Sequence, residues 1–348
     1  MKALNLYDTE DLRYEEDTPI PQIIREEDIL IKVQSAGICG SDLSRYKKLG
    51  PYVPGTTFGH EFSGVVAAMG SAVTQWKEGD RIAACPTFAC GNCIYCRQGF
   101  PTRCTDLTVI GAKQPGAYAE YVVLPASHAL PLPDEIDFDT ASLLEPSSVV
   151  LHGFYRTSIQ PGAAVAIMGV GSIGLLSVQW AKIFGSATIF AIDMDENKLK
   201  IAKQLGADIL INPLKEDTET VIKKHTASSG VDLAVESAGS PLTSEQVLAL
   251  PKKGGEVLYL GIPYGDITLH RYYFEKIVRN ELQILGAWNA LSAPFPGKEW
   301  TTGLYYMKTG QLDVKPMISH HLPLEKGPEI FQQLIHKEID AAKVLFHP

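Results

Sequence analysis

The sequence predicts an α/β protein in which a strand-rich N-terminal part precedes a doubly wound parallel sheet. Short apolar runs bounded by Gly and Pro fill roughly the first 145 residues, which is typical of strands joined by turns. From Gly153 onward, apolar runs of strand length alternate with longer helical patterns, which indicates a parallel sheet with helices on both faces. A glycine-rich turn between the first of these strands and the next helix favours the same fold.

The expected elements follow this change of pattern along the chain. Strands are predicted in the first part at residues 29–33, 62–66, 81–84 and 118–123. The parallel sheet is predicted from strands at 163–168, 188–192, 209–211, 231–235 and 257–260, with helices at 173–184 and 196–205. After Gly286 the pattern loosens, and a helix with its strand is expected within 326–346. The pattern alone leaves open whether this last segment forms a third domain or returns to the first part.

Length and composition narrow the classes of function. A chain of 348 residues suggests about two domains, and 45% hydrophobic with 20% charged residues is typical of a globular protein. The net charge of −9 disfavours a nucleic-acid or anionic-membrane partner. No apolar run approaches the ~20 residues that cross a bilayer. Acidic residues are scattered through the N-terminal segment, so no leader is predicted and a cytoplasmic location is expected.

Four cysteines lie close together in the pattern C-x2-C-x2-C-x7-C: Cys90, Cys93, Cys96 and Cys104. Four thiolates in one short loop can complete a tetrahedral shell around a structural zinc ion, leaving no open position. Disulfides, buried thiols and an iron–sulfur cluster are the alternatives, and a reducing compartment makes the first of these less favourable. We therefore predict a structural zinc here and look for the reaction elsewhere.

A glycine-rich turn predicts a dinucleotide-binding site. It follows an apolar strand and opens a helix, a context that gives the G-x-G-x-x-G pattern its meaning. The first glycine allows a tight turn, the second lets a pyrophosphate approach the backbone, and the third lets helix and strand pack closely. The phosphates would then lie at the N-terminus of the helix. The predicted cofactor-binding residues of this turn are Gly169, Gly171, Ser172, Ile173 and Gly174.

The end of the second strand indicates which dinucleotide is bound. Asp193 stands about twenty residues after the glycines, where a carboxylate accepts hydrogen bonds from the adenosine ribose. It would repel a 2′-phosphate, as would the nearby Asp195 and Glu196, so NAD is preferred to NADP. Lys198 lies close enough in sequence to weaken that preference, and we include it among the cofactor-binding residues.

A second metal site is predicted from Cys39-Gly40-Ser41-Asp42 and Gly59-His60-Glu61. Cysteine, histidine and a carboxylate are the ligands of a catalytic zinc ion, which keeps one position open. Each of these residues also has an ordinary structural role available, a buried thiol for Cys39 and a surface dipeptide for His60-Glu61. Their coexistence with a nucleotide site is what favours chemistry. Cys85, by contrast, has no partner motif.

The segment Gly59-His60-Glu61-x2-Gly64-x5-Gly70-x2-Val73 resembles the zinc signature of the medium-chain dehydrogenase/reductase family. The four-cysteine loop, the glycine turn and their order match that family as well, over essentially the whole chain. The resemblance implies a GroES-like β-barrel catalytic domain, residues 1–150 and 287–348, and a Rossmann NAD-binding domain, residues 151–286. It also implies two zinc ions per chain, one catalytic and one structural, and a homodimer or homotetramer.

The same resemblance implies roles for individual residues. The polyol branch of the family takes a third zinc ligand from a Glu-Pro segment, which corresponds to Glu145 here, while Glu61 is the competitor or a movable partner. Asp42 is expected to accept a hydrogen bond from the non-ligating nitrogen of His60 and so orient it. Ser41 corresponds to the position that relays the substrate proton. We thus expect Ser41, Asp42 and Glu61 to be catalytic.

The predicted reaction is hydride transfer between NAD and a secondary alcohol of a polyol or polyol phosphate. The segment 288–300 is similar to that of galactitol-1-phosphate 5-dehydrogenases. Lys298 and Lys48 are proposed phosphate contacts, with Arg45, Lys47 and Arg271 as further cations. Free polyols and L-threonine are alternative substrates. A zinc-free quinone reductase and a non-catalytic NAD- and zinc-binding protein are the other classes considered. His320, His321 and His347 are expected to be surface residues.

Overall fold

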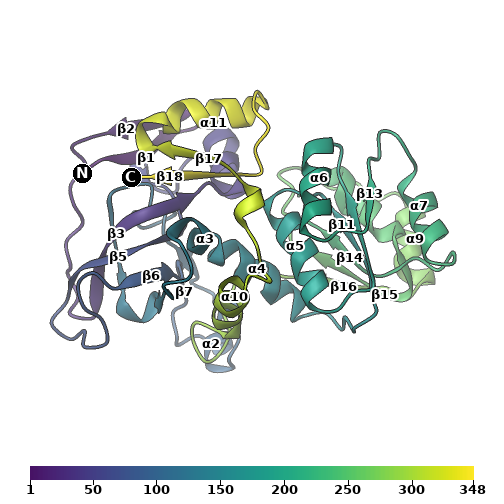
Figure 1. Cartoon of the computed structure of the whole chain (residues 1–348), viewed down its shortest axis with the longest axis horizontal. Coiled ribbons are helices and arrows are strands. Elements are labelled where there is room, and N and C mark those ends of the chain that lie inside the picture. Colours follow the sequence, from purple (N-terminus) through teal and green to yellow (C-terminus); the bar gives the residue numbers. More distant parts are fainter. The chain divides into compact units, whose positions relative to one another are not determined.

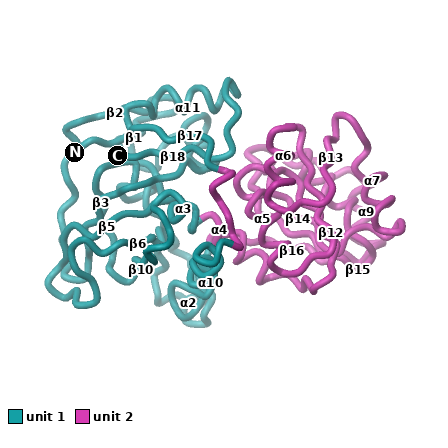
Figure 2. Tube along the Cα trace, in the orientation of Figure 1, with its two compact units in different colours: residues 1–145, 290–310, 318–348 teal, residues 146–289, 311–317 magenta.

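The computed structural model describes all residues from Met1 to Pro348. The chain folds into two compact units (Figures 1 and 2). Unit 1 comprises residues 1–145, 290–310 and 318–348, and unit 2 comprises residues 146–289 and 311–317. The predicted boundaries, 150/151 and 286/287, lie within a few residues of these breaks. The family resemblance implies a single crossing at the C-terminal end, whereas in the structure residues 311–317 return to unit 2.

Unit 2 is built on one six-stranded sheet in which every neighbouring pair is parallel. The strand order is β13-β12-β11-β14-β15-β16, so the chain starts in the middle, builds outward to one edge and then to the other. This is the Rossmann order, and its reversal point lies beside the first strand. The strands are β11 (Ala164–Met168), β12 (Thr188–Ile192), β13 (Ile209–Ile211), β14 (Val231–Glu236), β15 (Pro251–Tyr259) and β16 (Gln283–Gly286).

The central strands are apolar and almost entirely buried, as expected for a sheet covered on both faces. Helix α4 (Leu144–Phe154) precedes the first of these strands, and further helices link the strands along the chain: α5 (Ser172–Ile183), α6 (Glu196–Leu205), α7 (Thr218–His225), α8 (Pro241–Gln246) and α9 (Arg271–Arg279). Three of these helices begin with a side chain that accepts a backbone N–H: Asp195 for α6, Asp217 for α7 and Ser240 for α8. No side chain caps α5, which begins after the glycine turn.

Unit 1 is built on a seven-stranded, mainly antiparallel sheet in the order β10-β6-β5-β3-β18-β17, with β9 paired to β3. A three-stranded sheet (β2-β1-β4) and the pair β7-β8 complete it. The strands are β1 (Ala3–Asp8), β2 (Asp11–Glu15), β3 (Asp28–Gly37), β4 (Thr56–Thr57), β5 (Glu61–Met69), β6 (Arg81–Ala84), β7 (Thr87–Phe88), β8 (Thr108–Val109), β9 (Tyr121–Pro125), β10 (Ala129–Pro131), β17 (Ile318–Pro323) and β18 (Lys343–His347).

The helices of unit 1 are mostly short. They are α1 (Gly40–Ser44), α2 (Ile94–Arg97), α3 (Phe138–Ser142), α10 (Lys298–Lys308) and α11 (Gly327–His336). One turn of π-helix, Arg45–Leu49, extends α1. No helix of the chain combines the length and apolarity that a membrane-spanning helix needs.

The C-terminal segment returns to the N-terminal part, which answers the question that the sequence pattern left open. Strand β18 pairs antiparallel with β3 and parallel with β17. Phe346 of β18 and Phe331 of α11 pack edge-on against Tyr118, at ring-centroid distances of 5.2 and 6.3 Å. Such aromatic pairs add roughly 0.5–1.5 kcal/mol each to the area they bury. The core of unit 1 is therefore shared by the two ends of the chain.

Most predicted strands and helices lie within one or two residues of those observed. The largest differences concern two strands: β15 begins at Pro251 instead of residue 257, and the strand expected at residues 118–123 begins only at Tyr121. Tyr118 precedes it, fully buried, with its backbone N–H bonded to the carbonyl of Phe58. The apolar residues around Tyr118 in the sequence predict a strand there. In the structure, the Tyr118 ring packs instead against residues from distant parts of the chain, Phe331 and Phe346.

Candidate active site and cofactor sites

The four-cysteine loop forms one compact cluster. The sulfur atoms of Cys90, Cys93, Cys96 and Cys104 all lie within 4.8 Å of one another, and none forms a disulfide. Backbone N–H groups point at them: Cys90 N lies 3.2 Å from Cys104 Sγ, and Cys93 N lies 3.4 Å from Cys90 Sγ. Amide donation to sulfur stabilises thiolates. The loop thus has the donor set and the spacing that a closed tetrahedral zinc site requires.

The pKa values within this cluster diverge, as expected of crowded thiols. Backbone hydrogen bonds lower the pKa of Cys93 to about 6, while burial raises the pKa of Cys96 to about 12. Neighbouring thiols resist becoming negative together unless a cation compensates them. The observation fits a metal ion, which deprotonates its coordinating thiols.

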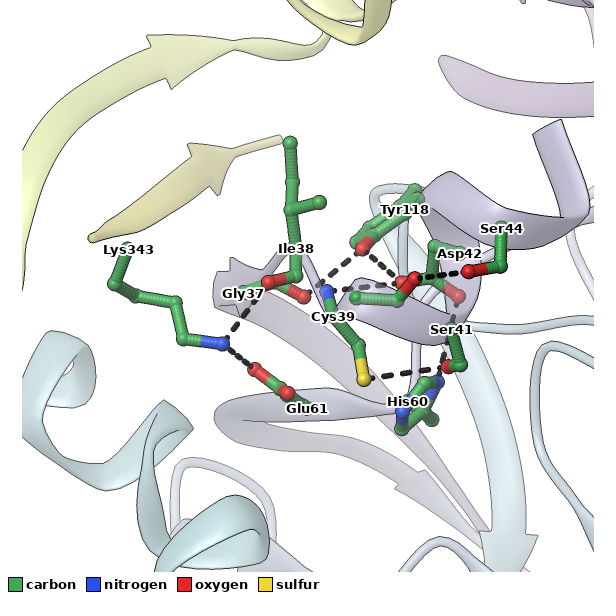
Figure 3. A network of polar contacts seen from close by, with 11 residues as sticks. Gly37, Ile38, Cys39, Ser41, Asp42, Ser44, His60, Glu61, Tyr118 and Lys343 are labelled. Carbon is green, nitrogen blue, oxygen red and sulfur yellow. Dashed lines mark hydrogen bonds and ion pairs between the residues drawn. The ribbon is translucent and has the colours of Figure 1, made fainter. Parts of the chain in front are cut away.

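Cys39 follows strand β3 and forms the N-cap of α1. Its backbone N–H donates to Asp42 Oδ2 at 3.1 Å, so the carboxylate closes the first turn of this short helix. The hydroxyl of Ser41 donates to Cys39 Sγ at 3.2 Å. The local sequence Cys-Gly-Ser-Asp therefore places a thiol and a hydroxyl side by side (Figure 3).

His60 and Glu61 meet Cys39 from the beginning of strand β5. The ligand atoms of Cys39, His60 and Glu61 all lie within 4.8 Å of one another. Gly59 makes this approach possible: its φ is +98°, and a Cβ there would lie 2.5 Å from the Tyr118 ring. Thiol, imidazole and carboxylate are donors that suit zinc. The structure thus groups three of the predicted site residues.

Electrostatics at His60 favour a positive charge. Burial disfavours the imidazolium, but Asp42 and Cys39 outweigh it and raise the pKa of His60 well above its usual value. His60 Nδ1 lies 3.6 Å from Asp42 Oδ1. This distance is slightly longer than a hydrogen bond, so the contact between Asp42 and His60 is an ion pair and not the expected hydrogen bond.

Tyr118 holds Asp42 in place, a role that the sequence does not indicate. Its hydroxyl lies 2.6 Å from Asp42 Oδ2 and 2.9 Å from the carbonyl oxygen of Gly37. The ring is fully buried. The sequence pattern predicts only a structural role for a tyrosine beside an apolar strand, and the position of Tyr118 next to Gly59 in space has no local signal.

Glu61 is paired with a residue near the other end of the chain. Lys343, the first residue of β18, forms a buried ion pair with the Glu61 carboxylate and also donates to the carbonyl of Ile38 at 2.9 Å (Figure 3). The two side chains are 1% and 2% exposed. Nothing in the sequence links a lysine in the tail to this site, because strand pairing between β18 and β3 brings it there.

Glu145 lies near this group but outside it. It stands in the first turn of α4 and is 7% exposed. Burial raises its pKa to about 7, against a lowering effect from the neighbouring His60. Its carboxylate is not among the ligand atoms that converge within 4.8 Å, whereas that of Glu61 is. Glu61 is therefore a member of the converging group, whereas Glu145, the expected third ligand, is not.

The glycine turn of unit 2 has the form that dinucleotide binding needs. Gly169 has φ of +89°, and a Cβ there would meet Ala238 at 2.6 Å. A Cβ on Gly174 would lie 1.9 Å from the carbonyl oxygen of Gly169, so helix and turn pack without room for a side chain. Gly171 faces open space, with no atom within 4 Å of an added Cβ. That opening, at an end of α5 without a side-chain cap, suits a pyrophosphate.

Asp193 directly follows β12 and faces the same turn. Its Oδ2 accepts from the N–H of Val170 at 2.8 Å, and its Oδ1 accepts from the N–H of Asp195 at 3.0 Å. A carboxylate has further lone pairs for ribose hydroxyls. Lys198 is in α6, with its Nζ 3.6 Å from Asp195 Oδ2. Its charge is thus partly balanced by the residue that caps its own helix.

The cations suggested for a substrate phosphate come from three elements of the chain. Lys298 begins α10, and Lys48 is exposed in the turn of π-helix. Arg45 stacks over the ring of Tyr52 at 3.5 Å. Arg271 lies in unit 2, paired with Glu275 at 2.8 Å.

Two family models match successive parts of the chain. Residues 25–134 match the model of the alcohol dehydrogenase GroES-like domain, and residues 172–301 match that of the zinc-binding dehydrogenase. The chain is 34% identical to sorbitol dehydrogenase of Bacillus subtilis, over 100% of this chain and 97% of the relative. The chain belongs to the zinc-dependent medium-chain dehydrogenase family, in its polyol branch. It is an enzyme of the class that acts on CH–OH donors.

Relatives within this family differ in substrate. Galactitol 1-phosphate 5-dehydrogenase of Escherichia coli is 31% identical, with 98% of each chain covered. L-Threonine 3-dehydrogenase of Bacillus velezensis is 36% identical, over 89% of this chain and 88% of the relative.

Solved structures agree with the fold. The crystal structure of galactitol-1-phosphate dehydrogenase from Escherichia coli superposes with a TM-score of 0.94 at 31% identity, covering 100% of both chains. A zinc-binding dehydrogenase from Sinorhizobium meliloti, bound to NADP, gives a TM-score of 0.89 at 31% identity, covering 100% of this chain and 99% of that one. The medium-chain dehydrogenase family binds zinc and NAD(P).

Proposed function

We propose that this dehydrogenase oxidises a secondary alcohol of a polyol or polyol phosphate, such as galactitol 1-phosphate, to the ketone with NAD. The convergence of the Cys39 thiol, the His60 imidazole and a carboxylate beside the Ser41 hydroxyl carries the proposal. Relatives that act on sorbitol and galactitol 1-phosphate support the substrate class. Oxidation removes a proton from the hydroxyl and a hydride from its carbon, which the nicotinamide accepts.

Cys39 and His60 would hold the catalytic zinc ion, with Glu61 or Glu145 as the third protein ligand. When bound there, zinc supplies a Lewis acid that makes the substrate hydroxyl easier to deprotonate. The donor set fits this ion, because one soft thiolate, one imidazole and one carboxylate leave a position for the alcohol. The surroundings that favour a positive charge at His60 would favour the metal as well.

Ser41 would accept the proton of the substrate hydroxyl and pass it outward. Its hydroxyl lies against Cys39 Sγ, beside the proposed metal position, and the residue is exposed, so the proton has a route to water. Asp42 would keep His60 oriented, since it is itself fixed by Tyr118 and by the amide of Cys39. Lys343 would balance the charge of Glu61.

The glycine turn would hold the pyrophosphate of NAD at the start of α5, and Asp193 would accept hydrogen bonds from the adenosine ribose. Its negative charge, with that of Glu196, disfavours a 2′-phosphate, so we propose NAD in preference to NADP. The four-cysteine loop would bind a second, structural zinc ion, giving two per chain.

The choice of third ligand can be tested by two isosteric variants. If Glu145 binds the metal, Glu145→Gln lowers catalytic zinc content while Glu61→Gln leaves it near the wild-type level. If Glu61 binds, the pattern reverses. Elemental analysis after dialysis should find about two zinc ions per wild-type chain and about one in the ligand variant. Zinc content unchanged in both variants would refute a carboxylate ligand.

L-Threonine is the second candidate substrate, favoured by the 36% identity to a threonine 3-dehydrogenase. NADH formation by the zinc-loaded enzyme should be compared for galactitol, galactitol 1-phosphate, sorbitol and L-threonine, with NADP as the control cofactor. We expect the highest kcat/KM for a polyol or its phosphate. Equal values for galactitol and its phosphate would contradict phosphate recognition, and threonine as the best substrate would replace the polyol.

A further inference from the structure

A third cluster of metal-binding side chains lies on unit 1, apart from the two zinc positions of the family. Asp139, His321 and His347 place their ligand atoms within 4.8 Å of one another. His347 Nε2 lies 2.8 Å from Asp139 Oδ1, and His321 Nδ1 lies 3.1 Å from Asp139 Oδ2. The two imidazole rings are tilted toward each other with centroids 5.4 Å apart.

The sheet brings the two histidines together. In the parallel pair of β17 and β18, His347 stands opposite Pro323, and His321 is two residues before Pro323 on the same strand. Successive side chains of a strand alternate between faces, so residues two apart share a face and diagonal neighbours come within reach of long side chains. His320, adjacent in sequence, points to the other face and bonds Ser319 Oγ at 2.9 Å.

Helix α3 supplies the carboxylate. Asp139 is in its first turn, which is fixed by Asp137 accepting from Thr140 N at 2.7 Å. Ser142 Oγ donates to the carbonyl of Asp139 at 2.8 Å, so the backbone of this residue is held on both sides. The carboxylate is thus presented to the two histidines from a regular element. Each of its two oxygens contacts a different imidazole: Oδ1 contacts His347 and Oδ2 contacts His321.

Two imidazoles and one carboxylate form the donor set that takes divalent transition metals with positions left for water. Three observations favour metal binding at this cluster. The donors already converge, each histidine offers a different ring nitrogen to the same carboxylate, and the site is reachable from solvent. The side chains of Asp139, His321 and His347 are 27%, 49% and 45% exposed.

We propose that Asp139, His321 and His347 form a surface site for a divalent transition cation such as Ni²⁺ or Zn²⁺. The site is separate from the Cys39 group and from the four-cysteine loop. A bound ion would join α3 to the last strand of the chain, because its ligands come from α3, β17 and β18. Occupancy should therefore stabilise unit 1 without being needed for the oxidation of alcohol.

Calorimetric titration of untagged, zinc-loaded enzyme with Ni²⁺ tests the site. Wild type should bind one equivalent of Ni²⁺ that His321→Gln and His347→Gln bind at least about tenfold more weakly, since loss of even an indirect contact to a metal costs 10–100-fold. Asp139→Asn tests the carboxylate independently. His336→Gln is the matched control, because this exposed histidine at the end of α11 lies outside the cluster.

Two further measurements distinguish this site from the zinc positions of the family. Elemental analysis before and after titration should show that the original zinc is retained, which excludes exchange at those positions. Ni²⁺ should raise the unfolding temperature of wild type and of His336→Gln, and not that of His347→Gln. Equal Ni²⁺ affinity in wild type and both histidine variants would overturn the proposal, as would an equal loss in His336→Gln. None of these outcomes depends on the proposed substrate.

Discussion

The buried ion pair between Lys343 and Glu61 should be essential to the stability of unit 1. Both side chains are at most 2% exposed, so neither charge has water as a substitute partner. Replacing Lys343 with Met keeps a long apolar stem and removes the ammonium. The Glu61 carboxylate is then left buried without its cation, and the carbonyl of Ile38 loses a donor.

The expected cost follows from that burial. Removing one partner of a buried pair typically destabilises a protein by about 3–5 kcal/mol, because the remaining charge is uncompensated. For a unit of this size, each kcal/mol lowers the unfolding temperature by roughly 2–4 °C, which gives a fall of roughly 6–20 °C. An exposed pair is worth about 0–1 kcal/mol.

Thermal unfolding of the proteins freed of catalytic zinc measures the effect, because a zinc ion beside Cys39 and His60 would give Glu61 a second cation. Lys326→Met is the matched control, because Lys326 pairs with Glu329 at 3.0 Å with both side chains more than half exposed. The double variant Glu61→Gln/Lys343→Met should recover part of the lost free energy of unfolding, since it also removes the uncompensated charge of the Glu61 carboxylate. A Lys343→Met protein that unfolds within about 1 kcal/mol of wild type, like the exposed control, would refute the reasoning.

Three other perturbations separate catalysis, cofactor binding and stability. Cys39→Ser should lower kcat by about a thousandfold or more, because several kcal/mol of Lewis-acid stabilisation is lost. NADH binding, measured by fluorescence titration, should be retained, and near-normal turnover would contradict the assignment of Cys39 as a zinc ligand. Gly171→Ala should unfold like wild type yet bind NADH more weakly, whereas Gly174→Ala should unfold at a clearly lower temperature, because only its Cβ would meet backbone; equal unfolding temperatures for the two would contradict this. Burial lowers the pKa of His128 to about 4. Below about pH 6.5 the imidazole is therefore protonated in the unfolded chain, whereas in the folded protein it stays neutral until near pH 4. The free energy of unfolding consequently falls as the pH drops through that interval. In His128→Phe this part of the acid loss should vanish, and unfolding curves of both proteins against pH would reveal it; parallel curves would count against it.

Local patterns predicted the fold and supplied candidate residues for the site. The strand–glycine–helix sequence around Gly169 specifies its structure through contacts a few residues apart, and the cysteine loop does so within about fifteen residues of chain. The zinc signature around His60 could be recognised in the sequence because its residues also follow one another at short, fixed spacings. In each case the spacing of residue types reflects geometry that one turn or loop imposes by itself.

Contacts between distant segments were not predictable in this way. Lys343 reaches Glu61 only because β18 pairs with β3, and Tyr118 reaches Asp42 only through the packed core of unit 1. The membership of Glu61 in the group around Cys39 and His60 is likewise visible only in the folded structure. No spacing rule links such residues, since their separation in sequence is set by the lengths of unrelated elements.

The sequence by itself determined the Rossmann order of elements and the four-cysteine loop, because each is encoded in a short, regular spacing. The roles of Cys39, Ser41 and His60 stay predictions that the family resemblance implies. Only the tertiary structure decided which carboxylate stands beside the thiol and the imidazole, and which cation balances it. It also brought Asp139, His321 and His347 together from three elements. Strand pairing and core packing fix those distances, and they act between segments that lie far apart in the sequence.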